Sequence, residues 1–178
     1  MRGFRLRRRG VAAVVCAAGL LTGCTSGEPA PGASPSAEAS GAHHYVKQPE
    51  QITWLTPQPP ADFLPDGVLL ALVEGGSPLV PGPFTFRLKF PPGSRLMPHT
   101  HPATERITVL SGVMHQGIGA RFDQSSTEAI PTGGFVYREP GIPHYVWFDQ
   151  ETVIQFHGTG PFGLTYLDSA DDPRTQRG

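Results

Sequence analysis

The sequence contains very little cysteine. Among its 178 residues there are two, Cys16 and Cys24. Residues 25–178 therefore cannot form a disulfide bond, a cysteine-ligated metal site or a cysteine nucleophile. A domain built from this part of the chain depends on its hydrophobic core, with or without a metal bound by other residue types.

The sequence also lacks an apolar run long enough to cross a membrane as a helix. The longest run near the N-terminus, residues 11–21 (VAAVVCAAGLL), is eleven residues long, whereas a bilayer-spanning helix needs about 20. It follows a basic stretch with five arginines in residues 1–9. A basic segment followed by an apolar run of this length is typical of a secretory signal peptide.

The apolar run ends in Leu21, Thr22, Gly23 and Cys24, which resembles the cleavage box of bacterial lipoproteins. The resemblance implies that residues 1–23 are a lipoprotein signal peptide and that Cys24 carries the lipid. Two or three acyl chains would anchor the protein stably, exported and attached to the outer face of the bacterial cell membrane. The alternative is an ordinary signal peptide followed by an incidental cysteine. An Arg-Arg pair before the run weakly suggests twin-arginine export.

Positive charge is scarce beyond the expected signal peptide. Taking its five arginines from the 14 basic residues leaves nine, against 15 acidic residues, so the formal charge of the mature chain is −6. This balance argues against nucleic acid or anionic lipid as a partner of the folded part. Membrane contact is therefore expected only through the lipid anchor. The 22 glycines and 20 prolines disfavour a helical architecture and suit an all-β domain with many turns.

The chain divides into three parts after the signal peptide. Residues 24–47 are rich in Pro, Gly, Ala and Ser, which predicts a lipid-anchored disordered linker. His43 and His44 close this stretch and are interpreted as solvated linker residues rather than a metal site. A single folded domain is expected over residues 48–170, and residues 171–178 are expected to form a frayed tail.

Short apolar runs separated by Gly and Pro predict strands in the folded domain. Residues 84–90 (FTFRLKF) alternate between apolar and polar side chains, the pattern of a half-buried strand. Other strands are expected at residues 52–55, 68–73, 106–110, 135–137, 145–148 and 152–156. Turn signals roughly every eight to twelve residues favour a sandwich or barrel.

Four side chains between residues 99 and 144 form a candidate metal site. His99 and His101 are two residues apart, so in a strand they point to one face. An antiparallel return of the chain would bring Glu105 beside them, and His144 is available downstream. Three imidazoles and a carboxylate suit one divalent transition metal, namely Fe, Mn, Ni, Cu or Zn, with positions left for water or substrate. The other interpretation is a set of surface polar groups near a turn.

The spacing of these residues resembles the two motifs of the cupin superfamily. The first motif, in which two histidines and a glutamate stand between two glycines, is matched throughout: Gly93, His99, His101, Glu105 and Gly112. The second has its glycines and histidine in register: Gly133, Gly141 and His144. It departs at Glu139, where the family has Pro, and at Phe148, where it has Asn. The resemblance implies an all-β jelly-roll barrel, or double-stranded β-helix, with a metal held near one mouth by the three histidines and the glutamate.

The same resemblance implies a metal-binding protein that acts on a small organic molecule. A dioxygenase is the leading hypothesis, and an isomerase or lyase is the next. The alternative is a non-enzymatic module that captures a small ligand or a metal at the cell surface. A tethered structural domain with a vestigial site is a third hypothesis, which the complete ligand set argues against. Family members commonly pair, and the apolar runs here permit a homodimer.

The remaining candidate residues have no assigned role. His115 and His157 are interpreted as structural or solvent-facing rather than as catalytic bases, and the role of Glu139 is open. Four apolar side chains are candidates for lining the pocket or packing in the core: Met97, Phe148, Phe86 and Met114. An apolar lining would favour a small aromatic or aliphatic ligand.

Overall fold

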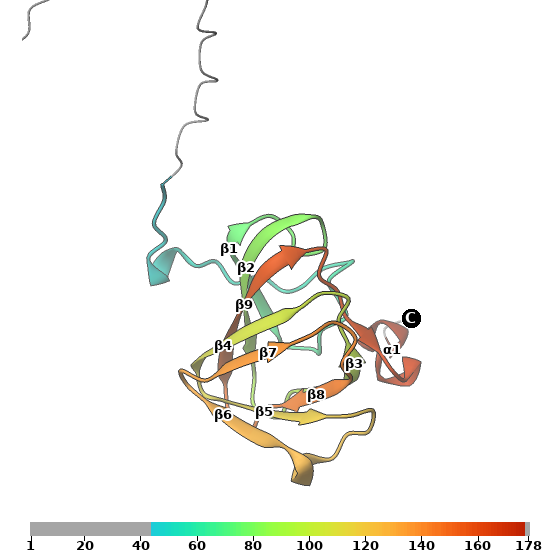
Figure 1. Ribbon diagram of the computed structural model, residues 1–178. Helices are drawn as coiled ribbons and strands as arrows, with labels where there is room; N and C mark the ends of the chain where they lie inside the picture. The colour runs from blue at the N-terminus through green and yellow to red at the C-terminus, as the bar shows by residue number, and fades with distance from the viewer. Residues whose placement is uncertain (1–43, 177–178) are drawn as a thin grey trace, which may run out of the picture. The chain divides into compact units, whose positions relative to one another are not determined.

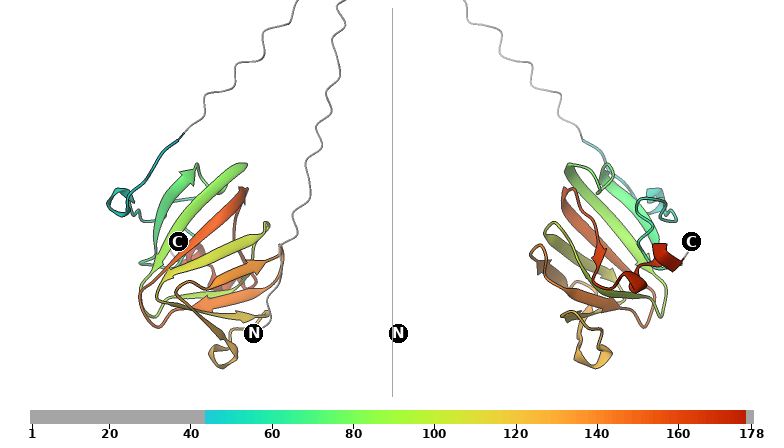
Figure 2. Two further views of the ribbon diagram at one scale, coloured as in Figure 1. Left: turned by 60° about the vertical axis from the view of Figure 1, so that its left-hand side comes forward. Right: turned by 90° about the vertical axis from the view of Figure 1, so that its right-hand side faces the viewer.

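Two antiparallel sheets lie face to face in the computed structural model, which describes residues 44–176 (Figure 1; Figure 2). The first sheet contains, in spatial order, β1 (Leu69–Gly75), β2 (Gly82–Phe90), β9 (Thr152–Gly160), β4 (Glu105–Ser111) and β7 (Phe135–Arg138). The second contains β10 (Thr165–Tyr166), β3 (Arg95–Thr100), β8 (His144–Trp147), β5 (Val113–Ile118) and β6 (Glu128–Pro131). The chain crosses repeatedly between the sheets, which is the predicted all-β jelly-roll barrel.

Helical structure within the described residues is confined to short turns. They are η1 (Pro49–Gln51), η2 (Gln124–Ser126), η3 (Ser169–Asp171) and α1 (Pro173–Gln176). Of these, η3 ends at the first residue of the expected tail and α1 lies within the tail. No helix among residues 44–176 is long and apolar enough to span a bilayer. The predicted signal peptide, Cys24, His43 and most of the predicted linker lie outside the described residues.

The core lies between the two sheets and follows from the alternation in β2. Phe84, Phe86, Leu88 and Phe90 are all at most 4% exposed, as the alternation predicts. Phe86 stacks on Phe156 of β9 with ring centroids 4.8 Å apart. Because burying each such side chain contributes about 1.5–3 kcal/mol, β2 supplies a large share of the stability of the barrel.

The strand prediction for residues 52–55 was wrong. Only Leu55 pairs there, exchanging two backbone hydrogen bonds of 2.8 Å with Leu70 of β1. Pro57, Pro59 and Pro60 follow at once, and proline has no N–H to continue a ladder. The segment therefore touches the edge of the first sheet at one point and then turns away.

The glycines of the two motifs occupy turns, where the backbone needs a conformation that side chains resist. All four have positive φ values: 85° at Gly93, 79° at Gly112, 87° at Gly133 and 77° at Gly141. Only glycine adopts such values without steric cost. Gly93 precedes β3, Gly112 follows β4 and Gly141 precedes β8, so these three turns help to place the strands that carry His99, Glu105 and His144.

Candidate metal centre

Strand pairing in the second sheet brings the histidines together. His99 of β3 and His144 of β8 are direct antiparallel partners, so their side chains leave the sheet on one face, with ring centroids 4.1 Å apart. His101 follows the end of β3 and its ring centroid lies 4.9 Å from that of His99. A register shift between Leu96 and His99 coincides with Pro98, which cannot donate to the ladder.

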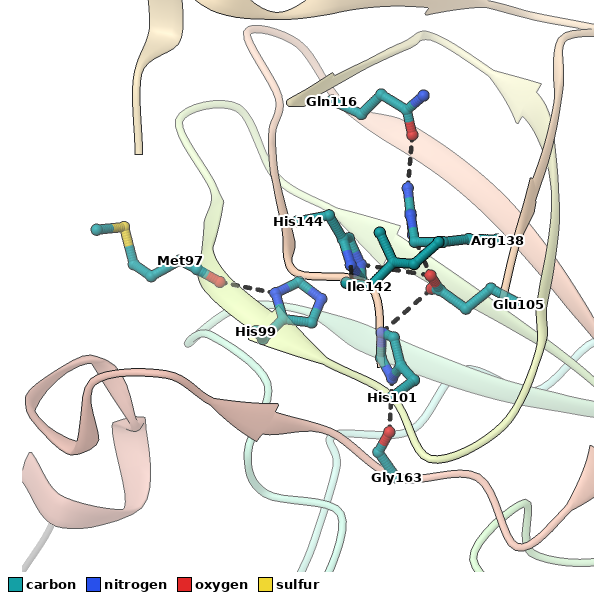
Figure 3. A network of polar contacts seen from close by, with 9 residues as sticks. All are labelled: Met97, His99, His101, Glu105, Gln116, Arg138, Ile142, His144 and Gly163. Atoms are coloured by element: carbon teal, nitrogen blue, oxygen red, sulfur yellow. Dashed lines mark hydrogen bonds and ion pairs between the residues drawn. The ribbon is translucent and has the colours of Figure 1, made fainter. Parts of the chain in front are cut away.

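Each of the three histidines is held by a hydrogen bond between its Nδ1 and a backbone carbonyl. The distances are 2.7 Å from His99 to Met97, 2.5 Å from His101 to Gly163, and 2.9 Å from His144 to Ile142 (Figure 3). Because a carbonyl can only accept, Nδ1 is the protonated nitrogen in every ring. In the neutral rings the lone pair then resides on Nε2, which is the tautomer that a metal ligand requires.

Glu105 enters the same space from the first sheet, at the start of β4. Its Oε1 lies 3.1 Å from Nε2 of His101 and its Oε2 lies 3.3 Å from Nε2 of His144. The four side chains are between 1% and 7% exposed. Nitrogen lone pairs that face a buried carboxylate need a cation or a shared proton between them. The cluster therefore has the donor set and geometry of a cation site.

A buried arginine shares the carboxylate. Arg138 of β7, which is 4% exposed, is the antiparallel partner of Glu105. Its Nη1 donates to Oε2 of Glu105, and its Nη2 donates to Oε1 of Gln116 on β5 at 2.6 Å (Figure 3). The arginine thus spans the barrel from the first sheet to the second and fixes the orientation of the carboxylate.

Burial and mutual repulsion keep the histidines suited to metal binding. Desolvation, followed by the charges of His144 and His101, lowers the pKa of His99 well below 6.5. Desolvation, with the charge of Arg138 adding to it, lowers the pKa of His144 to about 4. Burial alone would raise the pKa of Glu105, but its hydrogen bond with His101 and the charges of His101, Arg138 and His144 lower that pKa to about 2. At neutral pH the cluster therefore offers neutral imidazoles at His99 and His144 and an ionised carboxylate at Glu105.

Three of the four predicted residues form the tightest group. The possible ligand atoms of His99, His101 and His144 lie within 4.8 Å of one another. Glu105 stands beside them, in contact with His101, His144 and Arg138. A cavity of about 20 Å³ adjoins all four, which is room for about one water molecule or an ion. Nitrogen ligands with one hard oxygen fit a divalent transition metal.

The other sequence candidates lie away from this cluster. His115 stacks on Trp147 at 4.0 Å between ring centroids, with its Nε2 3.4 Å from Oδ1 of Asp149. His157 pairs with Thr85 in the β2–β9 ladder, and Glu139 is exposed after β7. Among the candidate lining residues, Met114 borders the small cavity, whereas Phe148 packs on Phe90 at 4.1 Å in the core.

Several residues around the cluster were not predicted. Arg138 and Gln116 belong to no motif, and their proximity depends on how the two sheets face each other. Phe162 stacks on the ring of His101 at 4.6 Å, and the neighbouring Gly163 supplies the carbonyl that orients His101. The loop between β9 and β10 thus supports His101 from 61 or more residues away along the chain. The one available signal was the position of Arg138, directly after the strand predicted at residues 135–137.

The sequence matches a family model that describes the ChrR cupin-like domain, over residues 42–163. None of the curated proteins searched matches it. The matched range contains both motifs and every residue of the candidate metal centre.

Solved structures with the same fold have low sequence identity to this chain. An acetylacetone dioxygenase from Acinetobacter johnsonii is 19% identical, with a TM-score of 0.55 over 78% of this chain and 87% of the other. A putative acetylacetone dioxygenase from Methylibium petroleiphilum is 20% identical, with a TM-score of 0.54 over 75% and 87%. The polyketide cyclase RemF from Streptomyces resistomycificus is 16% identical, with a TM-score of 0.56 over 75% and 94%. At these identities the likeness establishes the barrel fold.

Proposed function

The chain belongs to the ChrR cupin-like domain family, and on that premise we propose that it binds one divalent transition metal through His99, His101, His144 and Glu105. Fe, Mn, Ni, Cu and Zn all suit this donor set. The observation that carries the proposal is the set of three Nδ1-to-carbonyl hydrogen bonds. They fix three ligand-ready Nε2 atoms around one small buried space.

The proposed activity is metal-dependent turnover of a small organic molecule, with a dioxygenase as the leading subclass and an isomerase or lyase as the next. The metal, when bound, would polarise an oxygen group of the substrate or activate O₂ or water. Support for the dioxygenase comes from the fold shared with acetylacetone dioxygenases and from the nitrogen-rich donor set.

The side chains around the cluster would orient the ligands and exclude water. Apolar residues from both sheets, including Leu88, Met114 and Ile154, wall the small cavity, which lowers the local dielectric and strengthens electrostatic effects. Arg138 and Gln116 hold the Glu105 carboxylate in place. Oε1 of Glu105 faces His101, and the carboxylate stays ionised at neutral pH because its pKa is about 2.

Metal content tests the binding proposal directly. The full chain, purified and analysed by elemental mass spectrometry, should hold about one transition metal per chain, and a His99→Ala/His144→Ala variant should hold none. A His115→Ala/His157→Ala variant is the matched control, because it removes two histidines outside the cluster, and it should keep the metal. Failure of the wild type to retain any of the five ions after incubation would refute the proposal.

A binding module without turnover is the second candidate. The enclosure of the cluster favours it, because its four side chains are at most 7% exposed and the adjoining cavity is only about 20 Å³. Oxygen uptake by the iron-loaded protein, with acetylacetone as the first substrate tried, discriminates between the two. Uptake that is lost in His99→Ala/His144→Ala supports the enzyme. Saturable ligand binding without turnover, across a panel of small ketones and enols, supports the module.

We further propose that the protein is exported and lipid-anchored at the outer face of the cell membrane through Cys24. The support lies in the sequence alone: a basic segment, an eleven-residue apolar run and a Leu-Thr-Gly-Cys ending. Two or more acyl chains on Cys24 would give stable anchoring. The barrel would then meet ligands outside the cytoplasm.

A further inference from the structure

A second cavity, larger than the one at the histidines, lies on the inner face of the first sheet beside β1. Its volume is about 100 Å³. Leu70 and Leu72 of β1 stand opposite Leu88 and Phe86 of β2 in the strand register, and all four line it. The segments around Leu64 and Pro78 close the cavity from the other side.

This cavity carries no charged side chain. Of its twelve lining residues, Ser77 alone has a polar side chain, and the others are Ala, Leu, Phe or Pro. Ser77 is exposed, whereas Leu64 is buried, so the cavity reaches the surface near Ser77. A charged group placed inside would lose its hydration without gaining a partner, at a cost of several kcal/mol or more. The lining therefore favours uncharged, apolar ligands.

The two cavities are neighbours. Leu88 and Phe156 line both of them. Phe162 lines the larger cavity and stacks on the ring of His101 at 4.6 Å between centroids. A ligand in the larger cavity would thus contact the residues that separate this cavity from the histidine cluster.

Size decides which cavity can hold an organic molecule. The space of about 20 Å³ at the histidines admits about one water molecule. A dry apolar cavity of roughly 150 Å³ is known to bind benzene or xenon, and the larger cavity approaches that volume at about 100 Å³. Of these two cavities, the larger one therefore has room for the apolar part of a small organic ligand.

We propose that the cavity beside β1 is the binding chamber for the apolar body of a small uncharged ligand, with about six carbon atoms or fewer, whose reactive end faces the histidine cluster. The direction in which the ligand points rests on the proposed function. The existence of the chamber is independent of it. Phe162 lies between the chamber and His101. A ligand bound in the chamber would therefore affect His101 through contact with Phe162.

Probe binding tests the chamber independently of the metal. The protein used is the full chain with Cys24→Ser, because a lipid on Cys24 would compete for apolar probes. It would be stripped of metal and titrated with xenon, benzene and benzoate while its methyl NMR signals are followed. Xenon and benzene should shift the signals of Leu70, Leu72 and Leu88, and benzoate should leave them unchanged. Absence of shifts with xenon and benzene, or equal binding of benzoate, would overturn the proposal.

Two variants that fill the chamber make the test specific. Leu72→Trp fills it from β1 and Ala61→Phe fills it from the opposite segment, so one serves if the other fails to fold. Each should weaken benzene binding at least tenfold. Ile118→Trp, at a side chain that is 63% exposed at the end of β5, is the matched control and should bind benzene as the wild type does. Unchanged benzene affinity in a folded chamber-filling variant would contradict the assignment.

Metal loading separates this inference from the proposed function. If the protein binds Mn(II), the protons of chamber-bound benzene should relax faster in the loaded protein than in the metal-free protein, because the ion is close. Benzene binding without any metal retention would refute the proposed function but would still support the chamber. Metal retention without benzene binding would refute the chamber alone.

Discussion

Arg138 donates a hydrogen bond to Oε2 of Glu105, and the two residues are direct partners across β7 and β4. Both are at most 4% exposed. Oε2 also lies 3.3 Å from Nε2 of His144, so the arginine holds the oxygen that faces His144. The arginine therefore partly neutralises the only carboxylate of the cluster, and it competes with a metal for that charge.

Replacing Arg138 with methionine should destabilise the metal-free protein. Removing one partner of a buried ion pair leaves an uncompensated charge and costs about 3–5 kcal/mol of unfolding free energy. A bound divalent cation would offset part of that loss, so added metal should stabilise Arg138→Met more than it stabilises the wild type. Urea unfolding with and without metal measures both effects.

Arg106→Met is the matched control for this prediction. Arg106 is next to Glu105 on β4 but lies over the ring of Tyr137 at 5.5 Å, outside the cluster. Its loss should cost about 0.5–1 kcal/mol, and the stabilisation by metal should equal that of the wild type. Equal metal responses in the two variants would mean that Arg138 does not compete with the metal.

Cys24→Ser should release the protein from the membrane fraction. The serine hydroxyl cannot replace the sulfur that carries the acyl chains, and a mature chain with a formal charge of −6 has little affinity of its own for anionic lipid. Fractionation of cells followed by immunoblotting gives the distribution. Cys16→Ser is the control and should stay in the membrane fraction, since Cys16 lies within the apolar run. Retention of Cys24→Ser in that fraction would exclude the lipid anchor.

The sequence predicted the barrel and the four clustered residues for physical reasons. The alternation of residues 84–90 encodes a strand with one buried face. The His-x-His spacing places the ring of His99, in β3, and the ring of His101, directly after β3, 4.9 Å apart between centroids. Such patterns are local, so they can be read without knowing the fold. The same locality explains the error at residues 52–55, where the apolar pattern resembled a strand but prolines stopped the pairing.

The rest depended on contacts between distant segments. β5 was missed because Gln116, a polar residue, points inward to meet Arg138, which breaks the expected alternation. The loop that holds His101 through Phe162 and Gly163 comes from the far end of the domain. The apolar chamber forms only when β1, β2 and the segment around Leu64 are assembled.

Gly117→Ala should destabilise the barrel, because β5 passes very close to a buried tyrosine. A Cβ at Gly117 would collide with the ring of Tyr145, its partner across β5 and β8. Tyr145 is 2% exposed and its hydroxyl donates to the Asp123 carbonyl at 3.0 Å, so the ring cannot move aside cheaply. Overpacking of this kind costs about 1–3 kcal/mol.

Gly76→Ala is the matched control, because a Cβ there meets nothing within 4 Å. Its unfolding free energy should stay within about 0.5 kcal/mol of the wild-type value. Thermal and urea unfolding of both variants provide the comparison. A Gly117→Ala protein as stable as Gly76→Ala would show that Tyr145 can shift, and that β8, which carries His144, is less rigidly placed than the contacts indicate.

The metal-free protein should lose stability as the pH falls from about 6.5 to 4. His144 has a pKa of about 4 in the folded protein against 6.5 for an unperturbed histidine, so the unfolded chain binds more protons in this window. Unfolding free energy therefore falls with falling pH, by up to roughly 3 kcal/mol for this residue. His99 acts in the same direction, because its pKa is lowered as well. Glu105, whose pKa falls from 4.5 to about 2, adds a further loss below about pH 4.5.

Urea unfolding of the metal-free chain at pH 7, 5.5 and 4.5 measures this dependence. His144→Gln removes the titrating ring, so its unfolding free energy should depend less steeply on pH between 6.5 and 4. His157→Gln, on β9 outside the cluster, should retain the wild-type slope. If His144→Gln and His157→Gln gave the same slope, desolvation of His144 would not be the cause of the acid sensitivity. Bound metal holds His144 unprotonated, so the loaded wild type should resist acid to a lower pH than the metal-free protein.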